Sequence, residues 1–192
     1  MLKGMERIKR FLVLAIAILP IISTTSLQAA TFGGKASLMP FISRTGAFSI
    51  KMPGQPVYKS RVLRTETGSV TAHSYVTETD GGRYAYMVMY GDLNFDPARV
   101  GESVIIDRVR DGCAKGVNGR VVAEKNISVN GYPGKIIRVE AANYVGINKI
   151  VLVGRRVYQI GFGMAKGIAF PSDVVAFLDS FNTTTVRNTA RY

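Results

Sequence analysis

The segment Arg83–Tyr90, RYAYMVMY, is apolar on both of the faces that a β-strand presents. Successive side chains of a strand point to opposite sides. One side carries Tyr84, Tyr86, Val88 and Tyr90, and the other carries Ala85, Met87 and Met89. A strand of this kind needs apolar cover on both faces. The sequence therefore predicts a sheet with a packed layer on each side.

Seven further strands are predicted where apolar and β-branched runs stand between turn signals. They are Ala47–Met52, Val57–Glu66, Ser69–Thr77, Arg120–Val129, Lys135–Ala142, Ile147–Val153 and Arg156–Phe162. Asp80-Gly81-Gly82 and Gly154-Arg155 predict tight hairpin turns, and residues 130–134 predict a longer one. Because such short turns join neighbouring strands, the sheet is expected to be mostly antiparallel.

Two helices are predicted, far apart in the sequence. Asp96 suits an N-cap and Pro97 a first helical position, so one helix is expected over residues 97–115. The second is expected from Ser172, with its apolar residues on one side. The predicted fold class is α+β: a mostly antiparallel sheet of seven or eight strands covered by two helices, one on each face. This is a three-layer α/β/α sandwich.

The first 30 residues have the three-part layout of a secretory signal. Basic residues precede the apolar run Phe11–Ile22, and small residues end at Ala29-Ala30, where cleavage is expected. The run is shorter than the ~20 residues of a spanning helix. Residues 31–46 are expected to form a flexible leader, 47–182 a single domain and 183–192 a frayed tail. The sequence thus predicts an exported bacterial protein, periplasmic or extracellular.

The chain is strongly basic, with 25 lysines and arginines against 13 aspartates and glutamates. Without residues 1–30 the balance is still 21 to 12. Such a charge favours an acidic protein or an anionic component of the cell envelope as partner. Nucleic acid is disfavoured, because the sequence has no basic run and no basic helix. The predicted contact residues are Arg108, Arg110, Arg155 and Arg156.

The patterns expected of a catalytic or metal site are weak. His73 is the only histidine, and the adjacent Ser74 would point to the opposite face of a strand. We therefore interpret His73 as a hydrogen-bonded strand residue. Cys113, the only cysteine, cannot form an internal disulfide and lies on the apolar side of the first predicted helix. We interpret it as a core residue, and we predict no catalytic residue, cofactor or metal.

Three further patterns point to structure. Asp92–Asp96 resembles the start of a calcium loop, but Pro97 stands where the sixth position needs glycine, and Ser103 where the twelfth needs glutamate. Gly161–Gly167 lacks the spacing of a phosphate-binding motif and is predicted to be a flexible loop. The tyrosine stripe of Arg83–Tyr90 is interpreted as core under a helix.

Five segments occur in an order that is similar to a known family. They are Met52-Pro53-Gly54, Tyr86-Met87-Val88-Met89-Tyr90, Gly131-Tyr132-Pro133-Gly134, Leu152–Ile160 and Phe177–Phe181. In this order the chain resembles the PsbP-like α/β/α sandwich proteins over nearly all of the mature sequence. The resemblance implies the sandwich fold. It also implies an exported, protein-binding role, since the members named for photosystem II are extrinsic subunits. No metal-binding or partner-binding residue carries over by motif.

Three functions remain open from the sequence. The first is a non-enzymatic accessory or binding protein that docks a basic surface on an acidic protein or anionic envelope component. The second is a periplasmic carrier of a small apolar or lipid ligand, held in a pocket between sheet and helix. The third is a hydrolase whose residues meet only in the folded chain.

Overall fold

The computed structural model describes residues 37–65 and 68–184. The predicted signal over residues 1–30 lies outside them. A seven-stranded antiparallel sheet has the order β3-β4-β5-β9-β8-β7-β6, and a smaller sheet has the order β1-β2-β10. The large sheet consists of β3 (Val57–Thr65), β4 (Gly68–Thr79), β5 (Tyr84–Asp92), β6 (Arg120–Val129), β7 (Tyr132–Glu140), β8 (Tyr144–Val153) and β9 (Arg156–Ala165). The small one consists of β1 (Met39–Ser43), β2 (Phe48–Met52) and β10 (Asn182–Thr183).

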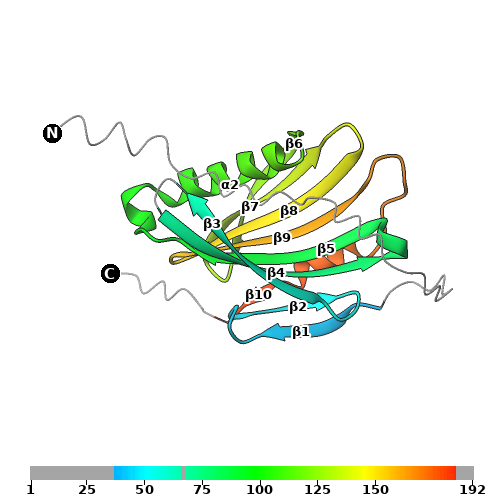
Figure 1. Ribbon diagram of the computed structural model, residues 1–192, viewed down its shortest axis with the longest axis horizontal. Coiled ribbons are helices and arrows are strands. Elements are labelled where there is room, and N and C mark those ends of the chain that lie inside the picture. Colours follow the sequence, from blue (N-terminus) through cyan, green and yellow to red (C-terminus); the bar gives the residue numbers. More distant parts are fainter. Residues whose placement is uncertain (1–36, 66–67, 185–192) are drawn as a thin grey trace.

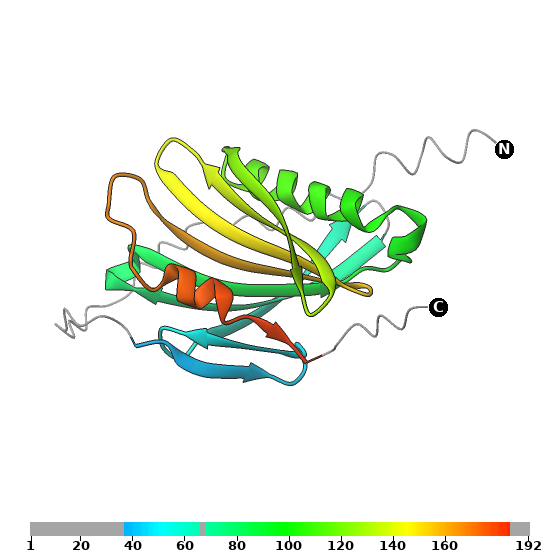
Figure 2. The same cartoon turned by 180° about the vertical axis from the view of Figure 1, so that it is seen from behind.

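Two helices flank the large sheet, on opposite sides. In Figures 1 and 2, α2 (Glu102–Gly116) runs along one side, and α3 (Val174–Asp179) lies with the small sheet on the other. The fold class predicted from the sequence is therefore confirmed: the protein is an α+β sandwich around a mostly antiparallel sheet. The structure adds that α3 covers its face together with strands from both ends of the described chain.

Strand β5 has the two-sided burial that its sequence predicts. It pairs with β4 on one side and β9 on the other. Val88 is fully buried on the face toward the small sheet, and Met87 and Met89 are buried on the face toward α2. Buried aliphatic and aromatic side chains of this kind supply most of the stabilising free energy of a domain.

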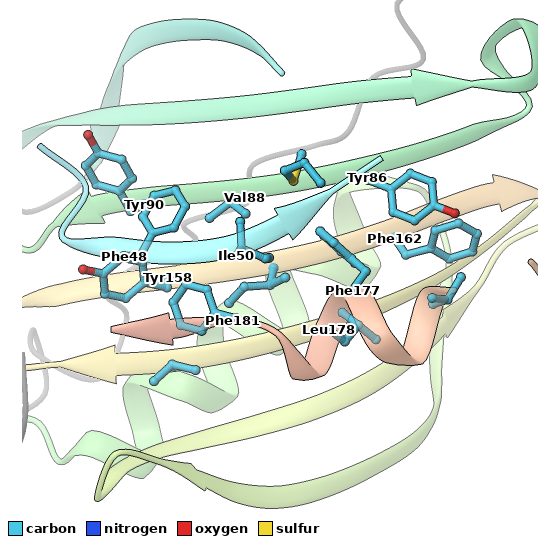
Figure 3. Close-up of a cluster of buried hydrophobic side chains, with 14 of the residues drawn as sticks. Phe48, Ile50, Tyr86, Val88, Tyr90, Tyr158, Phe162, Phe177, Leu178 and Phe181 are labelled. Carbon is cyan, nitrogen blue, oxygen red and sulfur yellow. The ribbon is translucent and has the colours of Figure 1, made fainter. Parts of the chain in front are cut away.

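The core beside the small sheet is rich in aromatic rings. Figure 3 shows Phe48 and Ile50 of β2 facing Tyr90 of β5 and Tyr158 of β9, with Phe181 beside them. Phe48 is fully buried and its ring contacts five others. The packing of these side chains, in addition to the covalent backbone, thus holds the small sheet against the large one.

The predicted boundaries at the ends of the domain are wrong. The segment expected to be a flexible leader, 31–46, contains strand β1 from Met39 to Ser43. It pairs with β2, and Phe41 packs on Tyr75 of β4. At the other end, Thr183 is buried and pairs with Phe48, although the sequence predicts that the frayed tail begins there. Short strands lack periodicity of their own, so only their partners reveal them.

The first predicted helix is divided. Asp96 does act as a cap, since its Oδ1 accepts a hydrogen bond of 3.0 Å from the backbone N–H of Ala98. It caps only a 3-10 turn, Pro97–Arg99. Gly101 has a φ of 98°, which is not helical, so α2 begins at Glu102.

The turn between β6 and β7 is shorter than predicted. Asn130 and Gly131 have φ values of 51° and 80°, and strand β7 begins directly after them at Tyr132. A two-residue hairpin turn needs positive φ at both positions, which Asn-Gly supplies with little strain. Pro133 and Gly134 therefore belong to the strand. No helix in the described part of the chain is long and apolar enough to span a membrane.

Candidate functional site: a basic edge strand beside an aromatic cluster

Arg108 and Arg110, the first two predicted contact residues, lie on α2. Arg110 donates hydrogen bonds to Asp111 at 2.8 Å, to Glu124 of β6 at 3.0 Å and to Asp107 at 3.2 Å. The bond to Asp111 is the main cause that raises the pKa of Arg110. Its guanidinium is thus surrounded by carboxylates of the same molecule, which reduces the positive charge offered to a partner.

Arg155 and Arg156, the other two, lie at the turn between β8 and β9. The Nε of Arg155 donates to the carbonyl oxygen of Leu93 at 2.9 Å. Arg156 makes a bidentate pair with Asp92, at 2.7 Å for each bond, and donates to the carbonyl of Thr45 at 3.0 Å. The hydrogen bond from Arg156 lowers the pKa of Asp92. Arg110, Arg155 and Arg156 therefore all have partners within the molecule, and the four predicted contact residues are divided between α2 and the β8–β9 hairpin.

Arg156 also begins an aromatic stack. Its guanidinium carbon lies 4.9 Å from the centroid of Tyr90, whose ring stacks on His73 at 4.7 Å with an interplanar angle of 14°. The Nδ1 of His73 shares a hydrogen bond of 2.8 Å with the hydroxyl of Tyr58. Side chains from β9, β5, β4 and β3 are thus joined in one row, which fixes Tyr58 on the outermost strand.

Strand β3 is the end of that row and an edge of the large sheet, since it pairs only with β4. It carries three exposed cations, Lys59, Arg61 and Arg64, and its segment Val57–Thr65 has no acidic residue. No ion pair among the described residues involves these cations. Unlike the guanidinium of Arg110, these three exposed cations form no ion pair with a carboxylate of residues 37–65 or 68–184.

The same strand exposes apolar side chains. Val57, Tyr58 and Val62 are 59%, 50% and 66% exposed. Exposed apolar side chains together with unpaired backbone groups on an edge strand are a template for pairing with another chain. The opposite edge, β6, differs in two ways: it has a bulge between Val121 and Ala123, and Glu124 interrupts its positive charge.

His73 and Cys113 lie as the sequence predicts. His73 is half-buried in the aromatic stack and hydrogen-bonded to Tyr58, and no cluster of three metal-ligating residues exists in the described ranges. Cys113 is buried on the core side of α2, and burial raises its pKa to about 12. A thiol held protonated in this way is a poor nucleophile.

The acidic loop and the tyrosine stripe also have structural partners. Asp92 binds Arg156 and Asp96 caps a turn. Tyr86 and Tyr90 are buried, and the hydroxyl of Tyr86 donates to Asp173 at 2.8 Å. Burial is the main cause that raises the pKa of Tyr86. The interpretation of the stripe as core is confirmed for Tyr86 and Tyr90. Tyr84 is only half-buried, and its hydroxyl donates a hydrogen bond to the carbonyl oxygen of Ala169.

The prediction of a flexible loop over Gly161–Gly167 is wrong for most of its length. Strand β9 continues to Ala165. Gly163 allows the ring of Tyr144 to lie flat on the sheet, because a Cβ at Gly163 would stand 2.7 Å from the Tyr144 hydroxyl oxygen. Gly163, one of the glycines that suggested a loop, therefore makes room for a neighbouring ring.

An open hollow lies beside the turn between β8 and β9. Its lining residues are Asp96, Pro97, Ala98, Glu102, Gly154 and Arg155. Half of these are charged, so the hollow does not match the apolar pocket between sheet and helix that a lipid carrier needs. Buried side chains fill the space under α2 and under α3.

The basic edge of β3 was not among the predicted contact residues. Its signal is present in the sequence as VYKSRVLRT, a strand pattern with three cations and no acid. The pattern becomes a site only because no strand covers the outer side of β3 among the described residues, and strand order cannot be derived from the local sequence.

Among solved structures, the chain matches a protein of the family that its sequence resembles. The chain is similar to the solution structure of cyanobacterial PsbP (CyanoP) from Synechocystis sp. PCC 6803, with a TM-score of 0.47 and 11% identity. The match covers 82% of this chain and 98% of the other. The similarity concerns the fold alone. No protein-family model matches the chain, and no curated protein matches it.

Proposed function

We propose that this protein is an exported, non-enzymatic binding protein of the bacterial envelope that docks its basic edge strand, β3, on an acidic protein. One observation carries the proposal: Lys59, Arg61 and Arg64 are exposed on a strand without acidic residues, and no described carboxylate pairs with them. The export part rests on the signal-like residues 1–30.

The charges of β3 suit recognition better than the predicted arginines do. Removing Arg110 or Arg156 from its carboxylates would sacrifice charge-assisted hydrogen bonds of the folded protein. Within the described part of the chain, the cations of β3 have no carboxylate partner to give up. Their interaction with a partner would be screened by salt, because the screening length is about 8 Å at 0.15 M.

The test compares two triple variants of equal charge. The first variant replaces Lys59, Arg61 and Arg64 with glutamine. The control variant replaces three exposed cations on other elements, Lys115, Arg120 and Lys125, also with glutamine. Binding to immobilised poly-L-glutamate is measured at 0.05 M and 0.5 M NaCl.

We expect the β3 variant to lose at least tenfold in affinity at low salt and the control variant to lose much less. Equal losses would mean that only the net charge matters and would contradict the proposal. If the wild-type protein binds vesicles with anionic phospholipid more tightly than poly-L-glutamate, the partner is an anionic membrane and the proposal of an acidic protein partner is refuted.

A further inference from the structure

We propose that β3 recognises its acidic partner by strand addition, in which an extended segment of the partner pairs with the outer edge of the large sheet. This deepens the proposed function and rests on it. Strand addition takes its affinity from backbone hydrogen bonds, and alternate side chains supply the specificity.

The edge has the regularity that strand addition needs. All nine residues of β3 pair in register with β4, from Val57 opposite Val76 to Thr65 opposite Gly68, without a bulge. Proline would remove a donor, but Pro56 precedes the strand and none lies within it. In a strand paired on one side only, half of the backbone N–H and C=O groups point outward.

The two faces of β3 favour different side chains on the partner strand. Val57, Lys59, Arg61 and Leu63 point to one face, and Tyr58, Ser60, Val62 and Arg64 point to the other. The first face presents two adjacent cations, Lys59 and Arg61. The second presents the exposed Tyr58 and Val62, with Arg64 near the end of the strand. Side chains directly opposite each other on paired strands interact. Opposite residues 57–62, the matching segment therefore alternates acidic with apolar or β-branched residues.

A second copy of this chain fits the edge poorly. Antiparallel pairing of β3 with itself about its midpoint sets Arg61 opposite Arg61. Like charges that face each other across a strand pair are destabilising. Arg61, which opposes this self-pairing, attracts an acidic strand, so the charge selects one kind of occupant.

The aromatic row prepares the edge for this role. Tyr58 is held by its hydrogen bond to His73, and His73 is held by stacking on the buried Tyr90. A strand fixed before binding loses less conformational entropy when a partner arrives. Half of the Tyr58 side chain stays exposed and offers a ring to the incoming segment.

The experiment uses the full mature chain and two synthetic peptides of nine residues. The probe alternates glutamate with valine, and the control has the same composition with the glutamates in one block. Amide hydrogen exchange of the labelled protein is followed by NMR with and without each peptide. At 90% occupancy we expect alternate amides of β3 to exchange about tenfold more slowly with the probe, because only the free tenth exchanges.

The outcomes separate this proposal from the proposed function. If the probe binds but the amides of β3 exchange as before, strand addition is refuted and side-chain docking stands. Equal binding of the block peptide would refute the alternating pattern. If neither peptide binds at 0.05 M NaCl, both proposals fail.

Reversing the charge at Arg61 tests independently whether this residue contacts the acidic side chains of the peptide. Arg61→Glu should abolish binding of the glutamate probe, and a peptide alternating lysine with valine should then bind the variant better than the wild type. Arg61 is exposed, so circular dichroism should show an unchanged fold. Failure of the lysine peptide to gain affinity would count against a cation–carboxylate contact at this strand.

Discussion

Phe48 tests whether the small sheet is an integral layer of the protein. Its side chain is fully buried between β2 and the large sheet, and Figure 3 shows it beside Tyr90 and Tyr158. Ring centroids of five aromatic side chains lie between 5.8 and 6.2 Å from its own. Phe48→Ala removes all five contacts at once and leaves a cavity between the two sheets.

The expected loss is large. Replacing a buried phenylalanine with alanine costs about 3–5 kcal/mol of the free energy of unfolding. Aromatic pairs add about 0.5–1.5 kcal/mol beyond the buried area, so we expect at least 4 kcal/mol, near the upper end of the range. With a urea m-value of about 2 kcal/mol/M, the unfolding midpoint should fall by roughly 2 M.

Val175→Ala is the matched control, because Val175 lies on α3 in the same layer but is 67% exposed. Its free energy of unfolding should change by less than about 0.5 kcal/mol. A loss below about 1 kcal/mol for Phe48→Ala would show that the small sheet contributes little to the folded state, and the two-sided cover of β5 would have to be abandoned.

Three further predictions concern titration and burial. Because Arg156 lowers the pKa of Asp92, the pair stabilises the fold above the ordinary carboxylate pKa, and this is lost as pH falls through the lowered value. Because the Asp92 side chain is more than half exposed, solvent screens the pair, and Asp92→Asn should cost at most about 1 kcal/mol in urea unfolding at pH 6. The cost should shrink as the pH falls through the pKa of Asp92, whereas a cost that does not change with pH would refute the linkage. Cys113, with a pKa of about 12, should react with Ellman's reagent at pH 8 only after unfolding in urea, and rapid reaction of the native protein would contradict its burial. The hydroxyl of Tyr144 is buried without a hydrogen-bond partner in the described structure, so Tyr144→Phe should leave thermal stability unchanged or raise it by about 1 kcal/mol. A clear loss would reveal a bond to that hydroxyl.

The strands and helices were the part of the fold that local patterns could predict. The hairpins at Asp80-Gly81-Gly82 and Gly154-Arg155 and the apolar side of α2 carry their signals in adjacent residues. Two of the errors occurred where a distant contact decides. Met39–Ser43 is a strand because β2 lies beside it. Gly161–Ala165 continues a strand because β5 and β8 pair with it on both sides.

For the candidate site too, local sequence indicated some features and distant contacts decided the others. The sequence shows a basic chain and its arginines, and it indicates core positions for Cys113 and Tyr86. It could not show that Arg110 and Arg156 are held by carboxylates, because Glu124 and Asp92 reach them only through the folding of the sheet. Nor could it show that the cations of β3 form no ion pair with any carboxylate that the structure describes.

The sequence by itself determined that a two-sided sheet would form, since a strand such as β5 has no polar face to leave in water. Only the tertiary structure decided what covers each face and which strand lies at the edge. The physical reason is range: periodicity and turn preference act between neighbours in the chain, whereas strand order and charge pairing depend on residues that are often more than 50 positions apart, as Arg156 and Asp92 are at 64.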